Sequence, residues 1–136
     1  MVYVKLVLDN KIIQMIDLFQ NLTGVNVVDC VEDEELYFVV GEGQYGLAVG
    51  KNGMKIKNAE RVFKKKIKVF EYSADLMTFI KNLVPEAEEI TQNEKAINIR
   101  IKQSAKAKVI GKSGRNIKIL NEILKRHFEI ETMKVK

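Results

Sequence analysis

The sequence predicts an α+β protein made of two similar small domains, each with the order helix, strand, strand, helix, helix, strand. Three observations lead to this prediction. The two halves of the chain align without a gap, helical and alternating apolar segments follow the same order in both, and each half contains one Gly-x-x-Gly turn. We expect a three-stranded sheet covered by helices in each domain, with domain 1 at residues 1–73 and domain 2 at residues 74–136.

An internal repeat with an offset of 61 residues carries most of this prediction. The segment VGKNGMKIK at 49–57 aligns with IGKSGRNIK at 110–118. Apolar residues of the preceding segments also align: Leu36, Phe38 and Val40 with Ile97, Ile99 and Ile101. Because the apolar phase persists over most of a unit, the repeat indicates a duplicated structural unit.

The first half begins with apolar residues at helical spacing in 12–22, and Gly24 follows as a C-cap. Strands are expected around 25–31 and at 36–40, joined by an acidic turn at Asp33-Glu34. A short helix from about Gln44 to Val49, the Gly-x-x-Gly turn and a longer helix come next. A strand at 67–72 ends the domain, and residues 3–8 also alternate like an edge strand.

The second half repeats this order. Asp75 is the expected N-cap of a helix whose apolar face lies within 76–83, and Pro85 ends that helix. Strands are expected around Ile90 and at 97–101, where apolar and polar residues alternate strictly. The second helix–turn–helix follows, and a closing strand at 128–135 completes the domain.

Charge and composition favour a polyanionic partner in a reducing compartment. The formal net charge is +5 at pH 7, and residues 74–136, with thirteen basic and eight acidic residues, account for all of it. No apolar segment approaches the roughly 20 residues that span a bilayer, and the N-terminus lacks the charge order of a signal peptide. Cys30 is the only cysteine, so no internal disulfide can form. We expect a cytoplasmic protein with no membrane partner.

The repeated turn has the composition of a phosphate-binding loop. Glycines without Cβ atoms let the backbone approach a phosphodiester closely, and the next helix offers N–H groups and the positive end of its dipole. Lysines in the turn add charge, and the neighbouring Asn or Ser can donate hydrogen bonds to phosphate. The predicted RNA-binding residues are Gly50, Lys51, Asn52, Gly53 and Lys55 in domain 1, and Gly111, Lys112, Ser113, Gly114, Arg115 and Asn116 in domain 2.

Apolar residues on either side of each turn extend the predicted site. Unstacked bases of single-stranded RNA lie against such surfaces. The predicted groove-lining residues are Val49, Ile56, Ile110 and Ile117. A glycine cap at a helix–helix corner would explain one such turn, but two copies, each followed by basic residues, favour binding.

The turns GKNG and GKSG, within this order of elements, resemble the signature loops of type II KH domains. The segments GLAVGK at 46–51, VFEYS at 69–73 and KRHF at 125–128, with Asp29-Cys30 and 111–117, are similar to archaeal NusA-like proteins over nearly the whole chain. The resemblance implies tandem type II KH domains that bind single-stranded RNA, most simply a nascent transcript, in transcription termination or antitermination. RNA polymerase and other transcription factors are further candidate partners.

The resemblance also has limits. It implies a KH pair without the N-terminal polymerase-binding domain and the S1 domain of bacterial NusA. Met54-Lys55 after the first turn differs from Arg115-Asn116 after the second, so the two sites need not behave alike. A ribosome-associated or ribosome-assembly KH protein would share every turn residue. A protein–protein adaptor that has lost RNA binding would show no salt-dependent RNA affinity.

Two glycine patterns and two reactive side chains are the features that could indicate enzyme chemistry. The G-x-G-x-x-G at 41–46 needs a long uninterrupted helix after it in a dinucleotide fold, but Gly50 and Gly53 interrupt that helix. The GKS at 111–113 lacks the earlier P-loop glycine, which is replaced by Lys106. His127 and Cys30 are the only residues of their types and lie in different halves, too few for zinc. We therefore expect no enzyme, cofactor, metal or small-molecule substrate.

Overall fold

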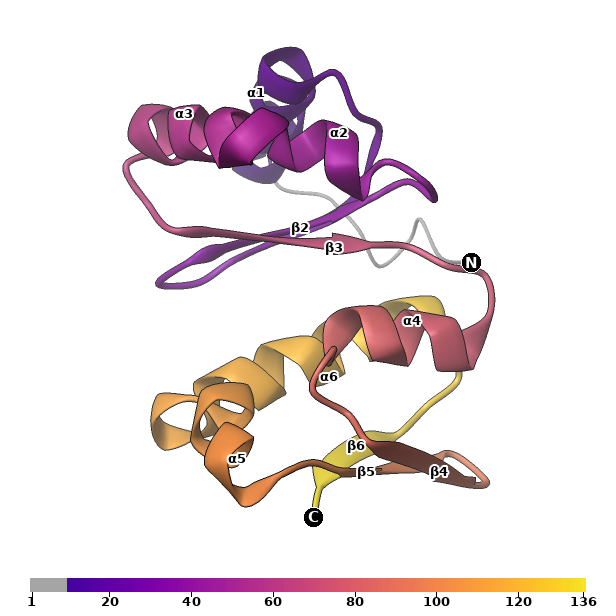
Figure 1. Ribbon diagram of the computed structural model, residues 1–136. Coiled ribbons are helices and arrows are strands. Elements are labelled where there is room, and N and C mark those ends of the chain that lie inside the picture. Colours follow the sequence, from indigo (N-terminus) through magenta and orange to yellow (C-terminus); the bar gives the residue numbers. More distant parts are fainter. Residues whose placement is uncertain (1–9) are drawn as a thin grey trace. The chain divides into compact units, whose positions relative to one another are not determined.

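The computed structural model describes residues 10–136, which form two compact units (Figure 1). Residues 10–73 belong to unit 1, and Ala74–Lys136 form unit 2. Each unit contains a three-stranded sheet built only from its own strands. The expected α+β fold is therefore confirmed, whereas the strand expected at residues 3–8 lies outside the described residues.

Unit 1 contains α1 (Asn10–Thr23), β1 (Val27–Glu32), β2 (Leu36–Val40), α2 (Tyr45–Val49), a short 3-10 turn η2 (Lys51–Gly53), α3 (Met54–Phe63) and β3 (Ile67–Glu71). The predicted cap of the first helix is confirmed. Gly24 has φ +81°, and its N–H donates to the Gln20 carbonyl at 2.8 Å. A left-handed glycine directly after a helix satisfies a carbonyl that would otherwise lack a partner.

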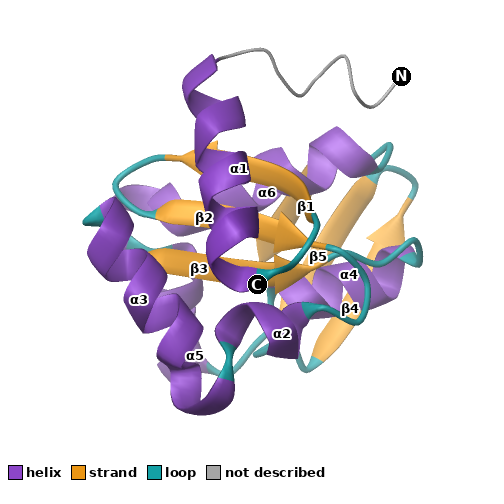
Figure 2. Ribbon diagram, turned by 90° about the horizontal axis from the view of Figure 1, so that it is seen from above, coloured by secondary structure: helices purple, strands orange, loops and turns teal. Residues whose placement is uncertain are grey.

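The sheet of unit 1 has β2 in the centre, antiparallel to β1 and parallel to β3. The three helices cover one face of this sheet (Figure 1), and Figure 2 shows α1 crossing above β1 and β2. Beneath them the rings of Phe19 and Phe38 stack with centroids 4.0 Å apart. The register of β1 shifts between Val27 and Asp29, a bulge that the valine-rich segment did not predict.

Unit 2 contains α4 (Leu76–Leu83), β4 (Glu89–Asn93), β5 (Ala96–Arg100), α5 (Gln103–Ile110), a short 3-10 turn η3 (Lys112–Gly114), α6 (Arg115–His127) and β6 (Thr132–Val135). Its sheet repeats the order and directions of the first. The predicted N-cap is confirmed, because Asp75 Oδ2 accepts the Thr78 N–H at 3.0 Å. Within residues 10–136, no helix is long and apolar enough to cross a bilayer.

The closing strand of unit 2 is shorter than the expected 128–135. It begins at Thr132, because Phe128 leaves the helix in an extended conformation and packs against Phe79, with ring centroids 5.6 Å apart. Ile130, between Phe128 and the strand in the chain, is buried. The apolar residues that suggested a long strand thus belong to the helix-to-strand connection.

Candidate nucleic-acid interface

The two Gly-x-x-Gly turns, turn 1 (residues 50–53) and turn 2 (residues 111–114), have the same backbone conformation. Gly50 and Gly111 both have φ +80°, with ψ 171° and 170°. At the third position, Asn52 and Ser113 have φ 56° and 57° with ψ 27° and 28°. In each turn the second glycine N–H donates to the first glycine carbonyl at 3.1 Å. The sequence repeat is therefore also a repeat of backbone geometry.

The first glycine of each turn is required for two reasons. Its φ and ψ fall in a region that essentially only glycine adopts. A Cβ on Gly50 would also lie 2.7 Å from Lys55 Cγ, and one on Gly111 would lie 2.7 Å from Asn116 Cβ. At its first glycine, the backbone of each Gly-x-x-Gly turn is thus in close contact with the N-terminal residues of the helix that follows.

The second glycine of each turn is required only for its conformation. Gly53 and Gly114 have φ +72° and +73°, and nothing lies within 4 Å of a Cβ placed on either. Both are N-caps of the following helices, α3 and α6, and neither provides a side-chain cap. The first N–H groups of these helices are therefore not covered by a capping side chain.

The predicted polar residues lie at the tips of the turns. Lys51, Asn52, Lys112 and Ser113 are exposed, and so is Arg115, the first residue of α6. The predicted groove-lining residues are all half-buried on the flanking helices: Val49, Ile56, Ile110 and Ile117. In each unit the structure thus combines an exposed cation, an exposed donor, a helix N-terminus and adjoining apolar surface.

Lys55 and Asn116, which occupy equivalent positions of the repeat, each bond to the protein itself. Lys55 Nζ donates to the Thr23 carbonyl at the end of α1, at 2.8 Å. Asn116 Nδ2 donates to the Val109 carbonyl near the end of α5, also at 2.8 Å. Carbonyls in the last turn of a helix lack partners within that helix. Both side chains therefore fasten the helix after the turn to an earlier helix, a role that sequence reasoning did not predict.

The predicted site residues did not include three exposed apolar residues on the helices that flank turn 1, although the sequence had already shown that Met54 differs from Arg115. Tyr45 and Leu47 on α2 and Met54 on α3 are between 47% and 64% exposed. The repeat alignment contained the signal, because all three positions carry cations in unit 2.

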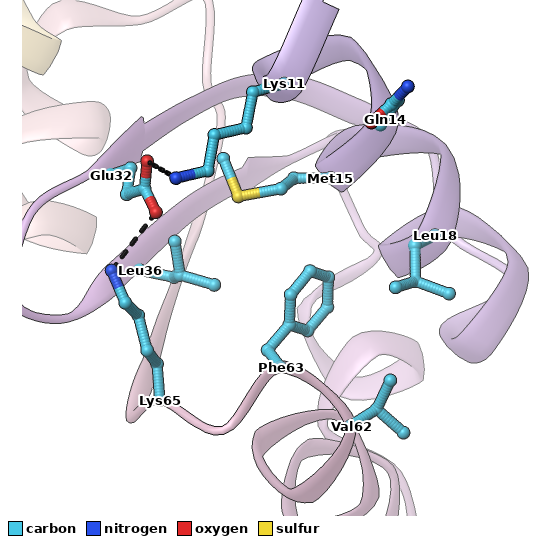
Figure 3. Close-up of a pocket in the computed structure, with 9 residues that line it drawn as sticks. All are labelled: Lys11, Gln14, Met15, Leu18, Glu32, Leu36, Val62, Phe63 and Lys65. Carbon is cyan, nitrogen blue, oxygen red and sulfur yellow. Dashed lines mark hydrogen bonds and ion pairs between the residues drawn. The ribbon is translucent and has the colours of Figure 1, made fainter.

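A hollow of about 450 Å³ lies elsewhere in unit 1, between α1 and the C-terminal end of α3 (Figure 3). Its apolar wall includes Met15, Leu36 and Phe63. At its edge Glu32 is held between Lys11 Nζ at 3.0 Å and Lys65 Nζ at 3.1 Å. The hydrogen bond from Lys11 is the main cause that lowers the pKa of Glu32, with Lys65 adding to it against the effect of burial. Turn 1 is at the opposite end of α3, roughly 15 Å away.

The two reactive side chains, Cys30 and His127, have structural surroundings: Cys30 is buried, and His127 contacts an aromatic ring. Cys30 is buried in β1, and its backbone N–H donates to Asp29 Oδ1 at 2.8 Å. His127 lies at the end of α6, edge-on to the Phe79 ring at 6.1 Å. Among the described residues, no group of three or more His, Cys, Asp or Glu is placed to hold a metal ion.

Comparison with known families agrees with the repeated geometry. Residues 15–83 match the KH domain family, and residues 76–136 match the NusA-like second KH domain. The chain is thus a protein of two KH domains. It belongs to the archaeal NusA-like family, as its relatives also indicate. The expected family is confirmed, and this family is not one of enzymes.

Three curated relatives share the name probable transcription termination protein NusA. The protein of Methanococcus vannielii is 38% identical over 94% of this chain and 78% of its own length. Those of Methanocaldococcus jannaschii and Thermoplasma acidophilum are 35% and 32% identical, over 96% and 97% of this chain and 75% and 96% of their own lengths. A crystal structure of APE1850 matches with a TM-score of 0.75 and 30% identity, covering 95% of this chain and all of that one.

Proposed function

We propose that this protein binds single-stranded RNA through turns 1 and 2, and that it acts on nascent transcripts in transcription termination or antitermination. The observation that carries the proposal is the duplicated turn geometry. In each unit an exposed lysine follows a glycine whose backbone conformation is essentially accessible to glycine alone. The name of the curated relatives supports the process, and RNA polymerase is a candidate partner in the cytoplasm.

Phosphate groups would lie on the turns. There they meet the Lys51 or Lys112 ammonium, the Asn52 or Ser113 side chain, and the N-terminal N–H groups of the next helix. Each KH turn clamps a stretch of about four nucleotides. The bases of that stretch would rest on the half-buried residues beside the turn, such as Val49 and Ile56. A duplex keeps its bases stacked and paired, so it cannot use this apolar surface.

A charge-reversal variant tests the site. We expect a variant with Lys51→Asp, Asn52→Asp, Lys112→Asp and Ser113→Asp to lose RNA binding, because carboxylates repel phosphate. The fold should survive, since all four positions are exposed and Asp tolerates the left-handed conformation of the third position. Fluorescence titration with an unstructured RNA measures the affinity, and circular dichroism verifies folding.

A matched control reverses the charge of two lysines that lie away from the turns. Lys95→Asp with Lys134→Asp changes two exposed lysines on the β4–β5 hairpin and on β6 of unit 2. This control should bind far more tightly than Lys51→Asp with Lys112→Asp. Equal losses in both would mean that net charge alone drives binding and would reject the turns as the site. Equal affinity for duplex and single strand would reject the proposed ligand, and crosslinking in cells that recovers ribosomal RNA instead of nascent transcripts would reject the proposed process.

A further inference from the structure

The helices that flank the two turns expose different kinds of side chain. In unit 1, Tyr45 is 48% exposed, Leu47 47% and Met54 64%. In unit 2 the equivalent positions carry Lys106, Lys108 and Arg115. The backbones of the two turns agree closely, so the difference between the units lies in side chains rather than in the shape of the turn.

The apolar residues of unit 1 stand on both sides of turn 1. Tyr45 is the first residue of α2, and its backbone N–H donates to Glu71 Oε1 at the end of the edge strand β3, at 3.1 Å. Leu47 lies on the same short helix, and Met54 directly follows turn 1 as the first residue of α3. All three residues thus lie within five positions of turn 1 in the chain, and an RNA strand whose phosphate lies on the turn would place its neighbouring bases close to them.

We propose that unit 1 selects unpaired bases through apolar and stacking contacts of Tyr45, Leu47 and Met54, while unit 2 holds phosphates through its cations. The proposal rests on the proposed RNA-binding function and deepens it. Stacking of a base on an aromatic ring is worth about 1–3 kcal/mol and depends little on base identity. Phosphate contacts instead give an affinity that falls with salt. The two KH domains would thus make different contributions to one RNA complex.

RNA fits this surface better than an apolar protein partner. The exposed lysine and asparagine of turn 1 lie between Leu47 and Met54 in the chain. A protein surface that covers both apolar residues would have to remove the Lys51 ammonium from water without a partner charge, which is costly. An RNA strand supplies that charge with its phosphates and offers the faces of its bases to the apolar side chains.

A fluorescent reporter at Tyr45 tests base contact directly. The chain contains no Trp, so Tyr45→Trp introduces a single indole whose emission responds to stacking. We expect binding of an unstructured RNA to quench this emission, with the quenching at saturation unchanged between about 50 and 200 mM salt. The control Val62→Trp places the indole at a position 44% exposed on the same unit, roughly 12 Å along α3 from Met54. We expect no quenching there.

Affinity measurements separate the two units. Tyr45→Ala with Met54→Ala should weaken binding by ~5- to ~150-fold for each base that loses its stacking partner, with an unchanged slope of log affinity against log salt. Lys106→Gln with Arg115→Gln should flatten that slope by roughly 0.7 for each phosphate that the variant no longer neutralises. All four side chains are exposed or half-buried, and circular dichroism verifies that the variants fold.

The outcomes distinguish this inference from the proposed function. If Tyr45→Ala with Met54→Ala retains full RNA affinity, the apolar residues serve another partner, such as a protein, and the inference is wrong. Equal flattening of the salt slope by both double variants would also overturn it. If the unaltered protein binds no RNA at low salt, the proposed function itself fails. Quenching at Tyr45→Trp, absent at Val62→Trp, supports the inference.

Discussion

Replacing Gly50 with alanine tests whether the turn has a backbone that only glycine can adopt. The φ of +80° and ψ of 171° lie in a region that costs other residues about 1–3 kcal/mol. The new methyl group would also lie 2.7 Å from Lys55 Cγ and 3.0 Å from the Lys55 backbone nitrogen. Overpacking of this kind costs about 1–3 kcal/mol more. We therefore expect the free energy of unfolding of unit 1 to fall by about 2–6 kcal/mol.

Gly53→Ala is the matched control within the same turn. Its φ is +72°, but nothing lies within 4 Å of the new methyl group. Only the left-handed conformation is penalised, by about 1–2 kcal/mol. The difference in free energy of unfolding between the two variants thus measures the combined cost of the steric contact with the helix α3 and of the more restricted conformation of Gly50.

Amide hydrogen exchange is the appropriate measurement, because it reports the opening of each unit separately. The amides of β2 report unit 1, and those of β5 report unit 2. Gly50→Ala should accelerate exchange in β2 and leave β5 less affected, whereas Gly111→Ala should do the reverse. If Gly50→Ala and Gly53→Ala accelerate exchange equally, Gly50→Ala has no additional cost in stability, and the argument from steric contact is refuted.

Two further predictions concern side chains of unit 1. Lys55→Met should destabilise unit 1 by about 1.5–3 kcal/mol, because the Thr23 carbonyl loses a charged donor. The same variant should leave the salt dependence of RNA binding unchanged in fluorescence titrations; a slope flattened by roughly 0.7 would show instead that Lys55 contacts phosphate. Glu32 has a lowered pKa, so its ion pairs stabilise the fold above the ordinary value of 4.5 and are lost as the pH falls below it. Urea unfolding of Glu32→Gln should therefore show a weaker loss of stability on acidification from about pH 5 than the unaltered protein, and parallel curves would contradict this.

Local features of the fold could be read from the sequence because local chemistry determines them. Gly24 and Asp75 cap helices through bonds to residues three or four positions away, and the β-branched and aromatic residues at 36–40 form β2. The role of Phe128 could not be read in this way. Its ring packs on Phe79, which is 49 residues earlier in the sequence, and an apolar residue before a strand looks like part of that strand.

In the candidate site, too, local features could be predicted from the sequence, whereas contacts between residues far apart in the chain could not. The repeat predicted both turns, because glycine, lysine and their spacing are local properties. It did not predict that Lys55 bonds to the Thr23 carbonyl, since that partner lies 32 residues earlier and a lysine after a basic turn resembles a phosphate contact. The contrast between Tyr45 and Lys106 was visible in the alignment. It gained meaning only when the exposed fraction of Tyr45 was known.

The position of turn 1 within the connection from β2 to β3 has a consequence for folding kinetics. These strands are parallel, so they pair only after the chain between them, which includes α2, turn 1 and α3, has crossed back over the sheet. Contacts of this kind form late and limit the folding rate. A strained turn would delay the closure of the sheet as well as weaken binding. Conversely, a ligand bound to turn 1 would slow the unfolding of the whole unit, because the ligand binds only the folded form.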